Sequence, residues 1–207
     1  MSNFDSWLVK GAYVLGVFAA LSAVWLLLGA ADAGDALKIV AIPTAILGAT
    51  TAGYTAFLFG QCEGRDLWQT PLLLPMLLAR AAIAGASAYV ILDIFMDIPS
   101  HRAVWWVLLG GVGAIAFLSW VELQSCGSRH VEMAIHDMTR GAQKRWFQFG
   151  VILGLLLPAT AMIIVLSNGY VSSTNTGIAA FAGLLALVGM FLSETAFVRA
   201  GQSVPLS

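Results

Sequence analysis

Six long apolar segments, joined by short polar links, dominate the pattern of hydrophobic and polar positions along this chain. They cover residues 12–31, 39–60, 71–92, 104–121, 147–167 and 178–198. Each is close to the length of about 20 residues that an α-helix needs to cross the hydrocarbon core of a bilayer. Because backbone groups in lipid must bond within their own segment, the pattern predicts helices rather than strands.

The link from residue 122 to residue 146 is longer than the others and has a pattern of its own. Its apolar positions recur at the spacing of one helical face, at Val131, Ala134, Ile135 and Met138. The positions between them are polar or charged: Arg129, His130, Glu132, His136, Asp137 and Arg140. This pattern predicts an amphipathic helix that lies in the membrane interface and ends at Gly141. The alternative is a solvated loop with chance periodicity.

Composition supports a lipid environment for most of the chain. Its 207 residues are 59% hydrophobic and 10% charged, whereas soluble domains carry about 25% charged residues. We therefore expect an all-α integral membrane protein that forms one helical-bundle domain over residues 1–207. It would have six transmembrane helices and one interfacial amphipathic helix. The net charge of −1 gives no reason to expect a nucleic-acid partner.

The positive charges predict how the bundle is oriented. The N-terminal segment lacks the basic start and the cleavage site of a signal peptide, so the first span is expected to remain. The side that holds both termini carries seven basic residues, and the other carries two, Lys38 and Arg102. Because cytoplasmic loops carry an excess of lysine and arginine, both termini are expected in the cytoplasm. Cys62 and Cys126 lie on that side, where thiols stay reduced, so neither a disulfide nor a metal site is expected.

Arg80 is the clearest candidate for chemistry because it lies deep in the third span. An ionisable group in hydrocarbon is costly unless it is paired or hydrated. Either Arg80 faces a buried ligand or an acidic partner, or it bonds to the carbonyl groups of a broken helix.

Four further carboxylates lie near the ends of spans. Glu122 closes the fourth span, where it is either a proton acceptor or an interfacial carboxylate in water. Glu194 is expected to be an interfacial carboxylate, in water or paired with Arg199 five residues later, and the alternative is a functional role. Asp93, together with Asp97 at the outer end of the third span, is expected to be solvated.

Tyr54 and the histidines bear on redox chemistry. The Tyr54 hydroxyl needs a polar partner in a membrane: either a ligand carbonyl or the water at an aromatic belt. All three histidines, His101, His130 and His136, fall outside the spans, so no haem is expected. Two cysteines are too few for the four ligands of an iron–sulfur cluster.

The stretch from Ala52 to Ser87 resembles the signature of the NrfD-type polysulfide reductase membrane subunits. Its elements are Gly53–Tyr54–Thr55, then a short loop from Gln61 to Trp68 that contains Gly64–Arg65–Asp66, and then Thr70–Pro71 through Pro75. Weaker similarity extends over nearly the whole chain. The first span resembles an internal helix of that family, which implies that two or three N-terminal helices of the family are missing here. Arg80 stands where family members more often carry a small or apolar residue, so its role is not implied by the resemblance.

The resemblance implies a quinone-interacting membrane anchor in a bacterial or archaeal cytoplasmic membrane. Such a subunit binds menaquinone or ubiquinone and holds a ferredoxin-like iron–sulfur subunit, often with a molybdopterin catalytic subunit. A second membrane subunit would supply the missing helices, and the chain would have no complete activity alone. Glu122 and Arg80 are the expected catalytic residues, and Tyr54, Arg80, Trp68 and Gln61 the expected quinone contacts.

In the implied mechanism, Tyr54 bonds a quinol oxygen, Glu122 accepts a proton, and Arg80 stabilises negative charge. Two other functions stay open. The chain could be a structural or assembly subunit of such a complex. It could also transport a small anion through a bundle centred on Arg80.

Overall fold

The computed structural model describes residues 6–96, 98–124 and 127–204. Among these residues the chain is helical and contains no β-strand, so the expected all-α fold is confirmed. The chain divides into two compact units, Met1–Cys62 and Glu63–Ser207. Each unit is described by itself.

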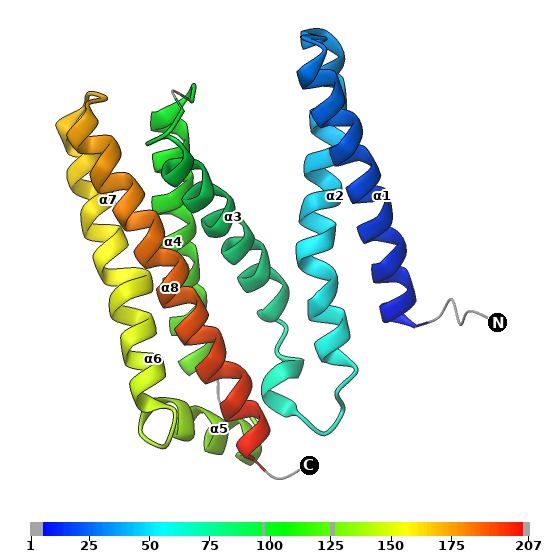
Figure 1. Cartoon of the computed structure of the whole chain (residues 1–207). Helices are drawn as coiled ribbons and strands as arrows, with labels where there is room; N and C mark the ends of the chain where they lie inside the picture. The colour runs from blue at the N-terminus through cyan, green and yellow to red at the C-terminus, as the bar shows by residue number, and fades with distance from the viewer. Residues whose placement is uncertain (1–5, 97, 125–126, 205–207) are drawn as a thin grey trace. The chain divides into compact units, whose positions relative to one another are not determined.

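The first unit is an antiparallel hairpin of α1 (Trp7–Ala30) and α2 (Gly34–Gly60) (Figure 1). A Cβ atom at Gly11 would come within 2.2 Å of the ring of Tyr54, so the absence of a side chain there lets the tyrosine lie directly on α1. Near one end of the hairpin, Trp7 stacks on Phe57 with 4.4 Å between ring centres. Small residues and stacked rings therefore hold this pair of helices together, as is typical where lipid removes the hydrophobic driving force.

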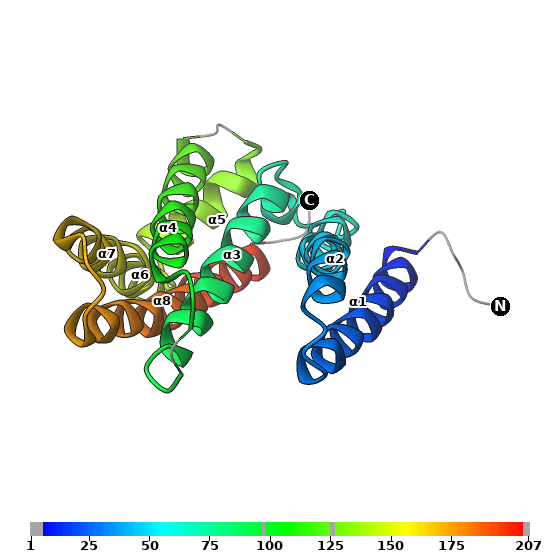
Figure 2. The same ribbon diagram turned by 90° about the horizontal axis from the view of Figure 1, so that it is seen from above.

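The second unit is a bundle in which α8 (Ser173–Ser203) packs against most of the other long helices (Figure 2). A short 3₁₀-helix, η1 (Asp66–Gln69), leads into α3 (Leu73–Leu92), which pairs with α4 (His101–Gln124). The next span runs without a break through α6 (Lys144–Val151), η2 (Ile152–Leu156) and α7 (Leu157–Asn168). Side chains such as Trp105, Leu108, Met162 and Val165 fill the core between these helices.

The π-helical turn η2 has a local cause in the sequence. Pro158 has no N–H group, so it cannot donate to the carbonyl four residues earlier, at Gly154. A π-turn, in which a carbonyl bonds to the fifth residue along, offers the next N–H instead. Gly154 also lies against α8, where a Cβ atom at Gly189 would come within 2.0 Å of the Gly154 nitrogen. Two backbones thus touch where the helix geometry changes.

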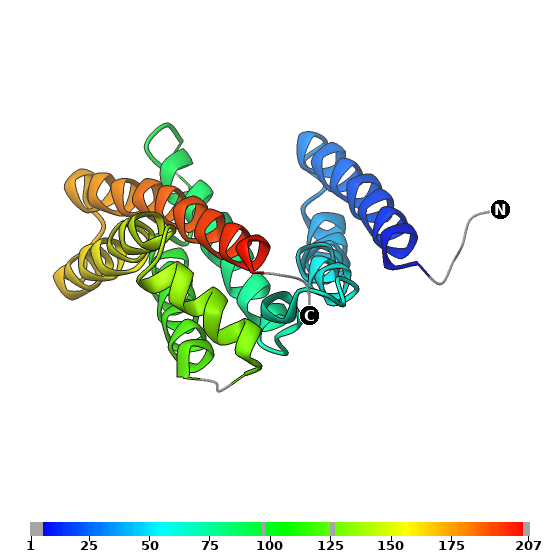
Figure 3. The same cartoon turned by 90° about the horizontal axis from the view of Figure 1, so that it is seen from below.

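The predicted amphipathic segment forms α5 (Arg129–Thr139), which lies across one end of the bundle (Figure 3). Ser128 caps its first turn by accepting a hydrogen bond from the backbone N–H of Val131 at 3.4 Å. Ala134 and Met138 are buried against the bundle, whereas Glu132 and His136 are exposed. The prediction of a helix with one apolar face is confirmed, although it ends at Thr139, before Gly141.

Six helices in the described part of the chain are long and apolar enough to cross a membrane, as the sequence predicts. Several are longer than the apolar segments: α2 begins at Gly34 rather than residue 39, and α8 covers Ser173–Ser203 rather than 178–198. Hydropathy marks only the apolar part of a helix. Polar turns at its end, such as the one with Asp35 and Lys38, continue the same backbone hydrogen-bond pattern beyond the apolar part.

The expectation that Asp93 is solvated is wrong. Its carboxylate is buried, accepts a hydrogen bond from the Ile98 N–H at 3.2 Å and lies 2.6 Å from Nδ1 of His101. The carboxylate therefore ties the end of α3 to the start of α4. Asp97 and Cys126 lie outside the described residues.

Candidate functional site

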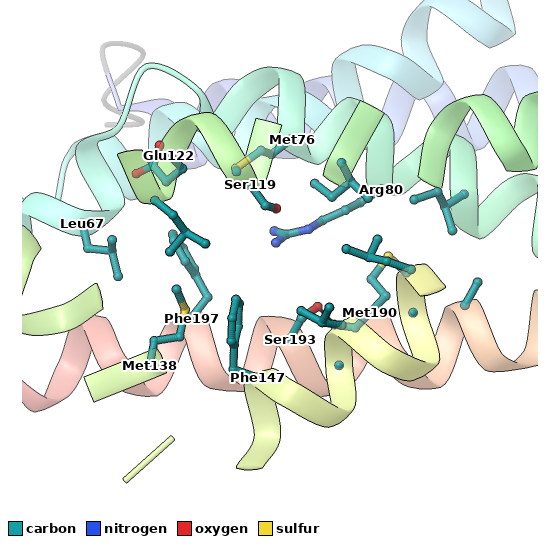
Figure 4. Close-up of a pocket in the computed structure, with 18 residues that line it drawn as sticks. Leu67, Met76, Arg80, Ser119, Glu122, Met138, Phe147, Met190, Ser193 and Phe197 are labelled. Carbon is teal, nitrogen blue, oxygen red and sulfur yellow. Dashed lines mark hydrogen bonds between the residues drawn. The ribbon is translucent and has the colours of Figure 1, made fainter. Parts of the chain in front are cut away.

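A cavity of about 790 Å³, including its open mouth, lies within the second unit (Figure 4). Helices α3, α4, α6 and α8 supply most of its wall, together with η1, η2 and α5. Its polar lining residues are Arg80, Ser119, Glu122 and Ser193, and the remaining positions are apolar or glycine. Ligand sites commonly combine an apolar wall with a few converging polar groups.

The Arg80 side chain extends from α3 into this space, with Ser119 and Ser193 on either side (Figure 4). It is 12% exposed, and its Nε atom lies 3.6 Å from Oε1 of Glu194. Its guanidinium makes no hydrogen bond to any residue that the structure describes. An arginine carries five N–H donors, so the cavity holds donor groups that a bound acceptor could satisfy.

The partner of Glu194 differs from the expected one. Arg199 does not pair with it; instead, its guanidinium carbon lies 5.2 Å from the ring centre of Trp146. Glu194 faces Arg80 because α3 and α8 pack along their lengths. Residues five apart on a helix point in different directions, whereas contacts between helices cannot be deduced from spacing.

Glu122 is 7% exposed, although it lies only two residues from the end of α4. The Thr70 hydroxyl donates to its Oε2 atom at 2.7 Å, and the same hydroxyl accepts from the Leu72 N–H at 3.2 Å. The second bond directs the hydroxyl proton toward Glu122. The other carboxylate oxygen, Oε1, makes no hydrogen bond within the described part of the chain and stays available to a ligand.

Flexible and aromatic side chains form the apolar wall. Met76, Met138 and Met190 come from three different helices, and Phe147 and Phe197 complete the labelled apolar side chains with Leu67 (Figure 4). Methionine adapts its shape to irregular partners. The cavity is therefore suited to a mostly apolar ligand that carries hydrogen-bond acceptors.

The remaining predicted contacts are not among the residues that line this cavity. Tyr54 packs on Gly11 in the first unit, where its hydroxyl makes no hydrogen bond to a described residue, and Gln61 is exposed at the end of α2. Trp68 is buried in the second unit but does not line the cavity; a Cβ atom at Gly201 would come within 2.3 Å of its ring nitrogen. The structure therefore brings Arg80 and Glu122 to one cavity.

Sequence reasoning missed Thr70, Ser119 and Ser193. One signal was available, because Ser119 and Glu122 are three residues apart and so share a face of α4 with Ile115. No such signal exists for Thr70, because a loop brings it to Glu122 from 52 positions away.

The six long apolar helices in the described part of the chain indicate a multi-pass membrane protein. The family model described as polysulphide reductase, NrfD, matches residues 1–205. The chain therefore belongs to the NrfD family, which confirms the resemblance seen in the sequence. No significant match to a curated protein or to a solved structure is found.

Proposed function

We propose that this chain is a quinone-interacting membrane subunit of a multi-subunit oxidoreductase and that the cavity beside Arg80 binds the quinone head group. One observation carries the proposal: the guanidinium of Arg80 enters a mostly apolar cavity, where its one described partner is Glu194 at 3.6 Å and no described residue accepts a hydrogen bond from it, and the buried carboxylate of Glu122 lines the same cavity. A quinone carries carbonyl acceptors on a flat ring and dissolves in lipid. It therefore matches both the donor group and the apolar wall.

Each polar side chain has a distinct role in the proposed reaction. Oxidation of a quinol releases two electrons and two protons. Oε1 of Glu122 accepts one proton as a general base, while Thr70 holds the carboxylate in place through Oε2. Arg80 donates to the ring oxygen and stabilises the negative charge that develops there. The second proton leaves to water through the open mouth, and quinone reduction runs the same steps backward.

The electrons must pass to another subunit in this proposal. The described residues contain no group of three or more His, Cys, Asp and Glu side chains that could hold a metal ion. A ferredoxin-like iron–sulfur partner, with or without a molybdopterin subunit, would accept the electrons. The distribution of lysine and arginine supports an orientation with both termini of this chain in the cytoplasm.

Tyr54 is proposed separately as a quinone contact. Its hydroxyl makes no hydrogen bond to the described residues of the first unit, and a tyrosine hydroxyl in a membrane usually finds a partner. Replacing it with phenylalanine removes only the hydroxyl, so a rise in KM for quinol would support this contact and unchanged kinetics would reject it.

The test compares two electron donors with the purified complex. Glu122→Gln should lower quinol-dependent turnover by at least about 100-fold, the usual size of a general-base effect, and Arg80→Gln should also lower it strongly. The matched controls Glu132→Gln, on the exposed face of α5, and Arg102→Gln should retain activity. A soluble donor that reduces the iron–sulfur subunit directly should keep its full rate in all four variants.

The same experiment also tests the alternative that this chain is a structural subunit. If Glu122→Gln and Arg80→Gln retain full quinol-dependent turnover, this chain has no part in the quinone reaction. It would then complete the helix bundle of a complex whose quinone site lies in another subunit.

A further inference from the structure

A cluster of positive charges lies at the end of the second unit where α6 begins and α8 ends. It consists of Arg140, Lys144, Arg145 and Arg199, all exposed, and we call it the basic corner. The first three lie in the turn after α5 and in the first turn of α6, and Arg199 is held over the ring of Trp146 at 5.2 Å. The contact between Arg199 and the Trp146 ring thus brings the charge of α8 next to the charges at the start of α6.

No carboxylate among the described residues neutralises these charges. None of the four forms a salt bridge with a carboxylate in the described residues. The nearest acidic residue along the chain, Asp137, is engaged elsewhere: its carboxylate accepts from the Ala142 N–H and from the Ser203 hydroxyl, both at 2.9 Å. The basic corner therefore has no counter-ion in the part of the chain that the structure describes.

The start of α6 adds a second preference for an anion. The first N–H groups of a helix have no partner inside it and carry partial positive charge. The Lys144 N–H bonds to the carbonyl of Gly141 at 3.2 Å, whereas Gln143, the residue before α6, makes no side-chain hydrogen bond that would cap the N–H groups that follow. Lys144 and Arg145 lie in this first turn, so fixed charges and helix polarity act at the same place.

The surface next to the basic corner is apolar and exposed. Along the α6 span, Phe149 and Ile152 follow Arg145 at the spacing of one helical face and are 56% and 43% exposed. On α8, Val188 and Phe181 lie on the face of Arg199 and are 41% and 60% exposed. Positive charge thus stands at the end of two exposed apolar faces.

From this arrangement we infer that the basic corner binds the phosphate head group of an anionic phospholipid, whose acyl chains lie along the exposed faces of α6 and α8. Charge complementarity selects the head group, because clusters of lysine and arginine at a membrane surface attract anionic lipids. Trp146 suits the same depth, because tryptophan is enriched at the membrane interface. The inference is independent of quinone binding, since none of these side chains lines the cavity.

The test uses the full chain in its complex, purified in neutral detergent and examined by native mass spectrometry. Phosphatidylglycerol and phosphatidylcholine are titrated separately, and bound lipid is counted. The triple variant Arg140→Gln, Arg145→Gln, Arg199→Gln should bind phosphatidylglycerol on the order of 100-fold more weakly, at about fivefold for each charge. The control variant Lys38→Gln, Arg102→Gln, Arg129→Gln removes as many exposed charges elsewhere and should bind like wild type.

Wild-type protein supplies a second measurement should the triple variant misfold. Retention of phosphatidylglycerol should exceed that of phosphatidylcholine and fall as salt concentration rises. The inference is overturned if the triple variant binds phosphatidylglycerol as well as the control does, or if wild type binds both lipids equally. It is also overturned if cross-linking shows a protein subunit seated on the basic corner and no phosphatidylglycerol is retained.

Discussion

At the scale of single residues, the account depends on how Glu122 is held. Burial of a carboxylate is costly unless hydrogen bonds replace water, and Thr70 supplies the one hydrogen bond that the described residues give it. The direction of that bond is fixed by the Leu72 N–H. Thr70 is therefore a positioning residue, and Glu122 is the group proposed to meet the ligand.

Thr70→Val should weaken this arrangement while keeping the side-chain shape. Loss of the hydroxyl leaves Oε2 of Glu122 without a partner, which should cost about 1–3 kcal/mol of stability and raise KM for quinol. Thermal unfolding of the complex and steady-state kinetics measure the two effects. Thr160→Val is the control, because that hydroxyl bonds only to carbonyls of its own helix region at an exposed position. Equal effects of the two variants would contradict a positioning role for Thr70.

The sequence was sufficient to select Arg80 and Glu122 as candidates, but not to find their partners. A charged residue within an apolar segment can be recognised from the sequence alone, because placing a charge in hydrocarbon is costly in any fold. The pairing of Arg80 with Glu194, and of Glu122 with Thr70, depends on which helix faces touch. For that reason the expected pair of Glu194 and Arg199 was wrong. The position of Arg80 fits the interpretation in which it faces a buried ligand or an acidic partner.

At the scale of helices, close backbone contact sets the geometry of the cavity wall. Gly150 and Gly154 both line the cavity and both lie on the span that packs against α8. A Cβ atom at Gly150 would come within 2.8 Å of the Ser193 nitrogen, and one at Gly189 within 2.0 Å of the Gly154 nitrogen. Larger residues would push α8 away from this span and widen the cavity.

Gly189→Ala should therefore destabilise the protein, whereas Gly177→Ala should not. Both residues lie in α8, but a Cβ atom at Gly177 would meet no atom within 4 Å. Alanine at that open position should stabilise the helix by about 0.5–1 kcal/mol. At Gly189 the overlap should cost at least about 1–3 kcal/mol. Melting temperatures of the two variants in the same detergent check the prediction, and a shift of the same sign in both would contradict it.

The C-terminal end of α8 depends on Arg65. Its Nη1 atom donates to the carbonyls of Gly201 at 3.0 Å, Gln202 at 3.0 Å and Val204 at 2.7 Å. These are the carbonyls that a helix end leaves without a partner. Neither spacing nor hydropathy predicts such a cap, because Arg65 precedes the carbonyls by more than 130 residues.

Arg65→Gln should loosen the last turn of α8. Hydrogen–deuterium exchange of peptides covering residues 198–204 should become faster, and stability should fall by about 1–2 kcal/mol. Arg129→Gln, at an exposed position on α5, should leave both measurements unchanged. Unchanged exchange in Arg65→Gln would show that the carbonyls are satisfied without the arginine.

At the scale of the whole molecule, hydropathy predicted the number and type of spans, because the requirement for about 20 apolar residues acts on each segment separately. The boundaries were less accurate, as α2 and α8 show, and the π-helical turn before Pro158 was missed. The division into Met1–Cys62 and Glu63–Ser207 has no signal in the apolar pattern, since the two parts are equally rich in spanning segments.

Labelling with a photoreactive azidoquinone tests the central claim, that the cavity of the second unit is the quinone site. The probe is bound to the purified complex, activated by light, and its adducts are mapped by peptide mass spectrometry. We predict labelling of cavity residues such as Met76, Met190 or Phe197 that excess quinone competes away and that Arg80→Gln strongly reduces. Competable labelling confined to residues outside the cavity, or to another subunit, would contradict the account.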